Sequence, residues 1–559
     1  MSRKKNISLS LLIPAGVILG ILAYFGSLNY LSLRGEEPRR AVVSYEMMKN
    51  KNYAVPTLFG WNYYNKPPVY NWLIVITSRI ARTFNQWVVR LPSLLSLLLL
   101  ILINYFIVRK FLNKEIALIT TLLLVMNVEL LFYGSVYTGE IDLFYSLIVY
   151  LQAISIFYFG SKKKLFDLYI VSYSLCAIGI LTKGLPSVAF QFFSLIAWAI
   201  AGRNVKVLFH WKHAIGILLL VVIVSVYFFI YSMYEDPWPY IHNLFLESSE
   251  KTVQGKTLFQ ILKTVLLFPL LLAKVLLPGF IFVVFFRRSS FFKEYKKSLF
   301  LKYIAWFIIL NLPLYWITPS FKLRYIYMFF PFITTFLGLL YITGKRNSPK
   351  VYSILEKIFL LVLVVLCLGY ISSYFINFQV QRDLTKWILT GILLSAILIT
   401  FLYIKLNSFR LYLLALSFLL FRIYLNYYYF PDFHARYSTS KEFIDKIREV
   451  TGNEPVYYAG KSSTRIIENT ITNRFAHKKK IEIADVPVIP LQIPFFMCYE
   501  KNQVLTFVEE TRESVFYISE KEYIENKPVT IWAETNKCLG NCAGYVLYKI
   551  KPEEHEIVP

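Results

Sequence analysis

Long apolar runs, separated by short polar segments, fill most of the first 430 residues of the chain. A helix needs about 20 predominantly apolar residues to cross about 30 Å of hydrocarbon. Thirteen windows approach or exceed this length, and the pattern predicts a helix over each of them. These windows are residues 8–30, 88–108, 116–134, 141–160, 168–182, 184–202, 213–233, 264–286, 302–318, 324–343, 353–375, 387–404 and 411–430. We therefore predict a mainly α, polytopic transmembrane helical bundle.

The first window follows a basic start, as the apolar core of a signal peptide does. It is longer than the core of about 7–15 residues that signal peptides have, and no clear small-residue cleavage site follows it. We expect residues 8–30 to be a retained first span.

The loops between the windows alternate in charge along the chain. One set is rich in Lys and Arg throughout: 109–114, 162–164, 203–212, 287–297, 345–350 and 405–410. The opposite set includes the acidic turn at 138–140 and the acidic stretch 235–250. Because basic loops stay on the cytoplasmic side, this alternation predicts a cytoplasmic N-terminus. An odd number of spans then places residues 431–559 outside the cytoplasm.

Two loops on the predicted outer side are unusually long, at about 31–87 and 234–263. Loops of this length are usually functional. In the first, apolar residues recur with helical spacing over Pro38–Lys51, which predicts an interfacial amphipathic helix.

The pattern changes after residue 430, and we expect two domains: a transmembrane domain over 1–430 and a small extracytoplasmic α/β domain over 431–559. In the second domain, Ser440 can cap a helix over Lys441–Val450, which Gly452 can end. Short runs rich in β-branched and aromatic residues predict strands at 456–459, 504–508, 515–518, 529–532 and 545–550.

Composition supports a membrane protein, since 57% of the residues are hydrophobic and 17% are charged. The net charge of +26 would suggest nucleic acid as the partner of a soluble protein. Residues 431–559, however, contain 17 Lys and Arg against 19 Asp and Glu, so the excess lies in the hydrophobic part. The positive charge is therefore a topology signal, and we expect membrane lipids but no nucleic acid as partners.

The five cysteines fall into two groups. Cys176 and Cys367 lie in apolar runs and are expected to be buried thiols. Cys498, Cys538 and Cys542 lie in the C-terminal domain, where an extracytoplasmic location would allow one disulfide and leave one thiol. A zinc site at Cys538 and Cys542 lacks further ligands at suitable spacing.

Charged side chains at the predicted outer ends of spans are the candidates for chemistry, because charge at membrane depth is costly without a partner or water. The carboxylates of this set are Glu36, Glu37, Glu140 and Asp142, and the cations are Lys66, Lys183, Lys322 and Arg324. The cations lie on the side where the positive-inside rule disfavours them, and a lipid phosphate would explain their position.

Plainer interpretations remain open for these residues. Glu36 and Glu37 precede Pro38, which suits the first turn of a helix, and acids there favour the helix dipole. Glu140 and Asp142 open a span and fit the same role. Prolines 67 and 68 hold Lys66 in extended backbone, where it can also be an interfacial anchor.

Taken in order, these motifs resemble glycosyltransferase family 39. They are an acid pair after the first span, Tyr-Asn-Lys-Pro-Pro at 64–68, Glu-x-Asp at 140–142, Leu-Thr-Lys-Gly at 181–184 and Lys-Leu-x-Tyr at 322–325. The resemblance covers about residues 1–430. It implies the C-type membrane glycosyltransferase fold and a sugar donor carried on a polyprenyl phosphate, as in protein O-mannosyltransferases and lipid A aminoarabinose transferases.

The resemblance also implies roles for particular residues. The family's catalytic acid falls on Glu36, followed by Glu37, and its second aspartate falls on Asp142. Lys66 takes the place of a lysine near the donor phosphate. A glutamate and a histidine associated with a metal in the lipid A branch fall on Asn65 and Ser248, so a divalent metal remains an open question.

The predicted activity is transfer of one sugar from undecaprenyl phosphate to an acceptor on the outer face, with inversion at the anomeric carbon. Lipid A or another envelope glycan is the expected acceptor, and a protein acceptor stays open. The alternative is a lipid or solute transporter or flippase, which would place ionisable groups or helix breaks at mid-span in repeated halves. A structural scaffold would leave the outer cations unexplained. Gly-rich phosphate loops are absent from the sequence, as expected if the donor is a lipid and not a nucleotide.

Overall fold

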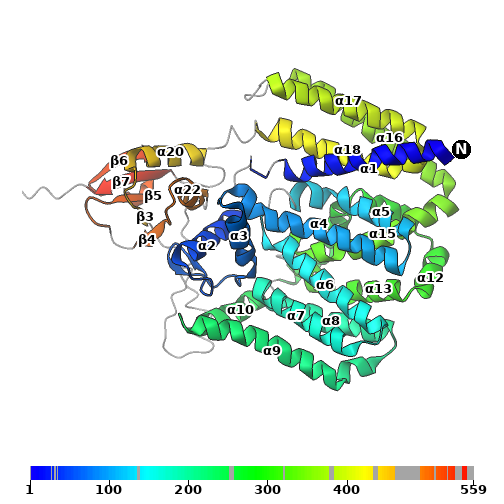
Figure 1. The fold of residues 1–559 in the computed structure, drawn as a ribbon, viewed down its shortest axis with the longest axis horizontal. Helices are drawn as coiled ribbons and strands as arrows, with labels where there is room; N and C mark the ends of the chain where they lie inside the picture. Colours follow the sequence, from blue (N-terminus) through cyan, green and yellow to red (C-terminus); the bar gives the residue numbers. More distant parts are fainter. Residues whose placement is uncertain are drawn as a thin grey trace, which may run out of the picture. The chain divides into compact units, whose positions relative to one another are not determined.

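The computed structural model describes most of the chain. The described residues are 2–26, 28–29, 33, 35–134, 139–250, 257–318, 322–376, 383–431, 439–459, 492–508, 511–524, 527–534 and 544–550. They form two compact units (Figure 1). Unit 1 comprises residues 1–31, 90–227 and 245–432, and unit 2 comprises residues 32–89, 228–244 and 433–559.

Unit 1 is helical in its described part. The helices that lie wholly or mostly in it are α1 (Ser2–Phe25), α4 (Gln86–Phe111), α5 (Lys114–Val125), η1 (Glu129–Gly134), α6 (Ile141–Ser161), α7 (Leu165–Lys183), α8 (Pro186–Ala201), η2 (Val205–Phe209), α9 (Trp211–Ser232), α11 (Leu258–Val275), η3 (Gly279–Phe285), α12 (Arg288–Lys297), α13 (Leu299–Asn311), α14 (Pro313–Trp316), η4 (Leu323–Phe329), α15 (Phe330–Asn347), α16 (Pro349–Ser372), η5 (Ser373–Phe375), α17 (Asp383–Lys405), η6 (Asn407–Phe409), α18 (Arg410–Tyr424) and η7 (Leu425–Tyr429).

The predicted spans are confirmed as helices, since each of the thirteen windows coincides with helical segments of the described chain. Among the described residues, ten helices are long and apolar enough to cross a membrane, so the chain is a multi-pass membrane protein. Three windows fall on shorter pieces. The described apolar part of α1 is Leu12–Phe25, α8 has 16 residues, and window 116–134 is divided between α5 and η1.

The helices of unit 1 pack against one another so that basic helix ends come together. Helix α6 packs against α7, α8 and η4, while α1, α16 and α17 lie beside α18 or one another (Figure 1). Lys110 at the end of α4 and Lys162 after α6 both donate to the Tyr158 hydroxyl, at 3.3 and 2.9 Å. The basic ends of neighbouring helices therefore coincide, as the alternating loop charges require.

Unit 2 contains a mixed sheet and helices from three stretches of sequence. Its elements are α2 (Glu37–Asn50), β1 (Thr57–Leu58), β2 (Trp61–Asn62), α3 (Val69–Ala81), most of α10 (Trp238–Glu250), α20 (Thr439–Thr451), β3 (Val456–Ala459), α22 (Gln492–Glu500), β4 (Thr506–Val508), β5 (Phe516–Glu520), α23 (Lys521–Ile524), β6 (Val529–Glu534) and β7 (Tyr545–Ile550). Strands follow the order β4-β3-β5-β7-β6, with β3 parallel to β4 and β5 and the other pairs antiparallel.

The helix and all five strands predicted after residue 430 are confirmed within about two residues, which is the usual uncertainty of element boundaries. Helices α22 and α23 and the β1–β2 hairpin were not predicted from the sequence. Cys498 lies buried on α22 with a free thiol, whereas Cys538 and Cys542 lie outside the described residues.

Helix α2 is confirmed over the predicted segment, but most of it is buried, including polar residues. Every residue from Arg40 to Met47 is buried, because α3, α22 and β1 pack around the helix. Tyr45 donates a hydrogen bond to Asn502, and Phe84 packs on Phe495 of α22 with ring centroids 6.2 Å apart. The first long loop and the C-terminal segment therefore share one core.

Candidate active site

Two carboxylates at the start of α6 belong to an ion-pair cluster in unit 1. Glu140 precedes the helix in extended backbone, and Asp142 lies in its first turn. The Glu140 side chain makes no capping hydrogen bond. Both carboxylates are about 5% exposed and face cations from other helices, so the dipole-only interpretation does not account for them.

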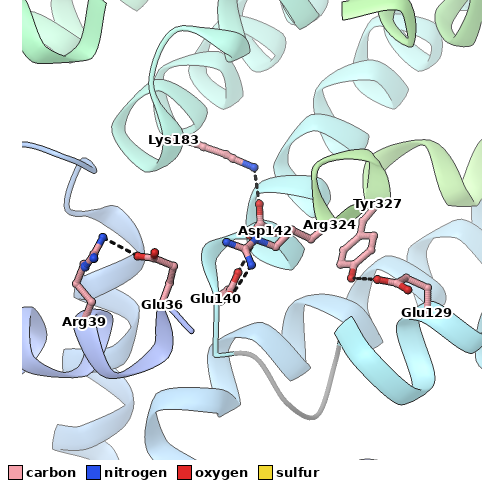
Figure 2. Close-up of polar contacts among 8 residues, drawn as sticks. All are labelled: Glu36, Arg39, Glu129, Glu140, Asp142, Lys183, Arg324 and Tyr327. Carbon is pink, nitrogen blue, oxygen red and sulfur yellow. Dashed lines mark hydrogen bonds and ion pairs between the residues drawn. The ribbon is translucent and has the colours of Figure 1, made fainter. Parts of the chain in front are cut away.

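Lys183 reaches these carboxylates from the last turn of α7. The helix ends there because Gly184 adopts a φ of +88°, a conformation that side chains rarely allow. The Lys183 ammonium forms an ion pair with Asp142 (Figure 2). It also lies 4.2 Å from the ring centroid of Tyr325 and 5.0 Å from that of Tyr145, so two aromatic faces partly replace its water.

Arg324 reaches the same acids from η4. Its Nη1 donates to Glu140 Oε1 at 2.9 Å, and its Nε lies 2.6 Å from Glu140 Oε2 and 3.0 Å from Asp142 Oδ2 (Figure 2). A guanidinium that contacts both oxygens of a carboxylate is held in a defined orientation. Segments separated by about 180 residues of chain therefore meet at one cluster of two cations and two anions.

This pairing makes each member costly to remove. Breaking a buried ion pair at one partner costs about 3–5 kcal/mol because it leaves an uncompensated charge. The cluster is not fully closed, because 22% of the Arg324 side chain is exposed. An incoming phosphate would compete with the two carboxylates for the same cations.

A third acid, Glu129, contacts the segment that carries Arg324. It begins η1, and its Oε1 accepts a 2.9 Å hydrogen bond from the Tyr327 hydroxyl (Figure 2). Four residues of this region were not predicted from the sequence as site residues: Glu129, Tyr327, Tyr145 and Tyr325. Glu129 was detectable in principle, because it is the one acidic residue inside window 116–134.

Glu36 lies at the start of α2 in unit 2. Its side chain makes no capping hydrogen bond and pairs instead with Arg39, at 2.9 Å between Oε2 and Nη1 (Figure 2). About a third of the Glu36 side chain is exposed, whereas Glu37 is fully buried. Of the two acids, only Glu36 presents a carboxylate to the surroundings.

Lys66 lies on a segment that α10 fixes from one side. The Tyr240 hydroxyl donates to the Lys66 carbonyl at 2.9 Å, and Asn243 donates to the Tyr64 carbonyl at 2.8 Å. The Lys66 ammonium donates to the Asn65 carbonyl at 3.1 Å. The first two hydrogen bonds hold the backbone at Tyr64 and Lys66. Glu36 and Lys66 both belong to unit 2.

Lys322 is exposed and immediately precedes η4. Lys183 and Arg324 are thus the two predicted cations that the structure brings together within unit 1, and they meet on carboxylates.

The residues that would hold a metal do not fit one in the described part of the chain. No three His, Cys, Asp or Glu side chains lie together there. The side-chain oxygen of Asn65 faces the Lys66 ammonium at 3.5 Å, and His242 packs against Trp238. The side chains of Glu247 and Ser248 lie outside the described set. We derive no chemistry from a metal.

Glu46 is a buried carboxylate of unit 2 that holds the β1–β2 hairpin. Its two oxygens accept hydrogen bonds from the Thr57 hydroxyl at 2.6 Å and from the amides of Phe59 and Gly60 at 2.7 and 3.2 Å. Burial outweighs these hydrogen bonds and raises the pKa of Glu46 to about 7. All three donors belong to the β1–β2 hairpin, so we assign Glu46 to the hairpin and not to the reaction.

Comparisons with known proteins agree with the family resemblance. A family model described as dolichyl-phosphate-mannose-protein mannosyltransferase matches residues 65–229. Two curated relatives are undecaprenyl phosphate-alpha-4-amino-4-deoxy-L-arabinose arabinosyl transferases. The one from Wigglesworthia glossinidia brevipalpis is 28% identical over 183 residues, which are 32% of each chain. The one from Shewanella sediminis is 25% identical over 246 residues, 42% of this chain and 43% of the relative. These matches span less than half of either relative.

A solved structure extends the likeness in fold to nearly the whole chain. ArnT from Cupriavidus metallidurans in the apo state has a TM-score of 0.68 and 14% identity over 98% of both chains. The same protein bound to undecaprenyl phosphate gives the same TM-score over 97% of this chain. The predicted fold class is therefore confirmed: a helical membrane bundle with a small mixed sheet near the C-terminus.

Proposed function

We propose that this chain is a membrane glycosyltransferase that moves a sugar from undecaprenyl phosphate to an acceptor on the outer face of the bacterial inner membrane. The donor class is supported by the names of the curated relatives and by the ArnT structure with bound undecaprenyl phosphate. The expected acceptor is a hydroxyl or phosphate of lipid A or of another envelope glycan.

The observation that carries this proposal is the meeting of Lys183 and Arg324 at the start of α6. Both cations come from helix ends that the loop charges assign to the outer side. A lipid phosphate lies at about that depth, and cations there gain from its negative charge. The pair therefore suits recognition of a phosphate that stays in the membrane plane.

The proposed reaction is a single displacement. The acceptor oxygen attacks the anomeric carbon, the bond from that carbon to the phosphate oxygen breaks, and the phosphate leaves with the electron pair. Glu36 takes the proton of the acceptor hydroxyl. One displacement inverts the anomeric configuration. The phosphate is already a good leaving group, so the protein supplies a base and cations.

The two kinds of carboxylate have different roles in this scheme. Asp142 lies between two cations, whereas Glu36 is partly exposed and pairs with Arg39. We assign proton removal to Glu36. Asp142 and Glu140 hold Lys183 and Arg324 in place until the phosphate arrives, and Lys66 and Lys322 are proposed further phosphate ligands. Glu37 is proposed to support Glu36.

The chain's orientation and domains belong to the same proposal. We place the N-terminus in the cytoplasm, the transmembrane domain over 1–430 and the periplasmic domain over 431–559. The basic helix ends around Tyr158 support this orientation, because they lie on the side opposite to the ends that carry the acidic cluster.

Mass spectrometry of envelope glycolipids and glycoproteins, with and without the gene, tests the activity. The proposal expects one sugar to disappear from a lipid or glycan acceptor in the deletion strain and to return with the wild-type gene. A lost modification on a protein would identify a protein acceptor instead. A transporter or flippase would change where a glycolipid resides, and an acceptor that still carries its sugar in the deletion strain would contradict transferase activity.

A further inference from the structure

The Glu129–Tyr327 hydrogen bond lies outside the roles assigned above, although it contacts the segment that carries Arg324. Tyr327 is 3% exposed, and its hydroxyl donates to a carboxylate within a predicted span. A carboxyl group at that depth is costly without a partner, and the Tyr327 hydroxyl supplies one.

Helix η4 has the geometry to transmit the position of one side chain to another. It is a 3-10 helix over Leu323–Phe329, and residues three apart in such a helix lie on the same face. Arg324 and Tyr327 are three apart. Fixing the Tyr327 hydroxyl therefore fixes the rotation of η4 about its axis, and with it the direction in which Arg324 leaves the helix.

Glu129 is itself on an anchored segment. The Val128 amide donates to the Leu277 carbonyl at 3.0 Å, and the Asn127 side chain donates to the Val275 carbonyl at 2.9 Å. The Asn127 oxygen also accepts from the Leu130 amide at 3.0 Å. The bonds to the Leu277 and Val275 carbonyls join the start of η1 to the end of α11 and the residues just after it. Glu129 can consequently serve as a fixed point for η4.

We infer that Glu129 is a positioning residue that acts through Tyr327 to aim Arg324 at the phosphate site. The side chains of η4 then have separate contacts: Arg324 with Glu140 and Asp142, Tyr325 with Lys183, and Tyr327 with Glu129. The contact between Glu129 and Tyr327 sets the orientation of η4. The contacts of Arg324 and Tyr325 belong to the phosphate site. The link to phosphate rests on the proposed function, but the aiming of Arg324 does not.

Chemical modification of Arg324 tests the aiming directly. Phenylglyoxal reacts with accessible guanidinium groups, and peptide mass spectrometry gives the rate at each arginine. We expect Tyr327→Phe and Glu129→Leu each to speed modification of Arg324 by about tenfold, the change expected from one hydrogen bond to a charged group. Glu129→Gln keeps an oxygen that accepts from Tyr327 and is expected to stay within about threefold of wild type.

A matched control removes another buried tyrosine hydroxyl from the same unit. Tyr303→Phe loses a 2.7 Å hydrogen bond to the Ala153 carbonyl and has no contact with η4 of the kind that Tyr327 makes. It is expected to leave the Arg324 rate unchanged. The double variant Glu129→Leu/Tyr327→Phe is expected to match the single variants, because both remove the same bond. Wild-type Arg324 rates in Tyr327→Phe, or an equal increase in Tyr303→Phe, would overturn the inference.

Binding of undecaprenyl phosphate to the purified full chain gives the second readout. Tyr327→Phe is expected to weaken binding by about tenfold while Tyr303→Phe binds as wild type. If wild type binds no undecaprenyl phosphate, the proposed function fails, and the Arg324 rates still decide whether Glu129 positions it. If Tyr327→Phe changes the Arg324 rate but not binding, the phosphate role of Arg324 is wrong.

Discussion

At the scale of single residues, the site separates two tasks between acids of different surroundings. Asp142 contacts Lys183 and Arg324, whereas Glu36 pairs with Arg39 and keeps about a third of its side chain exposed. A carboxylate between two cations holds its charge and orients its partners. A partly exposed carboxylate can accept a proton. The assignment of roles follows from these partners.

Replacing Glu36 separates the base from a helix cap. We expect Glu36→Gln to abolish transfer while protein level and undecaprenyl phosphate binding stay unchanged, because the amide cannot take a proton. Glu36→Asp is expected to retain some turnover. A cap role predicts a loss of about 1 kcal/mol of stability with residual activity. Steady-state transfer measures the activity, and thermal unfolding in detergent measures the stability. Normal turnover by Glu36→Gln would show that Glu36 is not the base.

The ion pair of Lys183 with Asp142 can be tested by changing its members singly and together. Asp142→Asn is expected to lower the free energy of unfolding of the helical unit by about 3–5 kcal/mol, because it removes a buried carboxylate that two cations contact. Lys183→Met is expected to lower it by less, because Asp142 keeps its contact with Arg324. The double variant is expected to recover much of that stability and no transfer. Recovery of transfer in the double variant would show that the pair is structural only.

At the scale of elements, apolar periodicity predicted the helices well because a span must be continuously apolar over its length. The strands after residue 430 were predictable from their β-branched and aromatic runs. Window 116–134 was less so: Asn127 accepts the Leu130 amide and ends the regular helix there, a local competition that hydropathy does not register. Helix α2 was predicted as an interfacial amphipathic helix, but tertiary packing buries its residues from Arg40 to Met47, polar ones included.

The site residues were predictable by position, whereas their partners were not. Glu140, Asp142, Lys183 and Arg324 stood out as charges at span ends. Their pairing depends on which helix ends are neighbours in space, and sequence spacing of about 40 to 180 residues does not give that. Glu129 was missed although it is the one acid inside window 116–134, and Tyr327 was missed because one tyrosine at the end of a span resembles an ordinary interfacial side chain.

The β1–β2 hairpin should depend on pH through Glu46. The pKa of this carboxyl is raised from 4.5 to about 7, so the folded state binds its proton more tightly than the unfolded state. The hairpin's stability is then full below about pH 4.5 and falls by about 3 kcal/mol as pH rises through 7. Hydrogen exchange at the Phe59 and Gly60 amides measures it.

Glu46→Gln is expected to remove this pH dependence from the exchange free energy. Glu442→Gln, which changes an exposed acid on α20 of the same unit, is the control and should leave the slope intact. An exchange free energy for the Gly60 amide that does not decrease from pH 5 to pH 8 in wild type would contradict the account of Glu46.

At the scale of the whole molecule, loop charge and the two compact units lead to one topological prediction. We expect a reporter that is active only in the periplasm to give signal when fused after residue 437, because thirteen spans from a cytoplasmic start end outside. A reporter fused within 162–164 should be active only in its cytoplasmic form. Cytoplasmic activity after residue 437 would contradict the number of spans and the placement of residues 431–559.

The central claim is that the chain consumes a polyprenyl-phosphate sugar. The most direct measurement incubates the purified protein with glycosylated undecaprenyl phosphate extracted from the deletion strain, together with that strain's envelope as acceptor, and counts both products by mass spectrometry. The account predicts one undecaprenyl phosphate released for each sugar transferred, with wild type but not with Glu36→Gln. Recovery of the glycosylated lipid intact after incubation with wild type would contradict it.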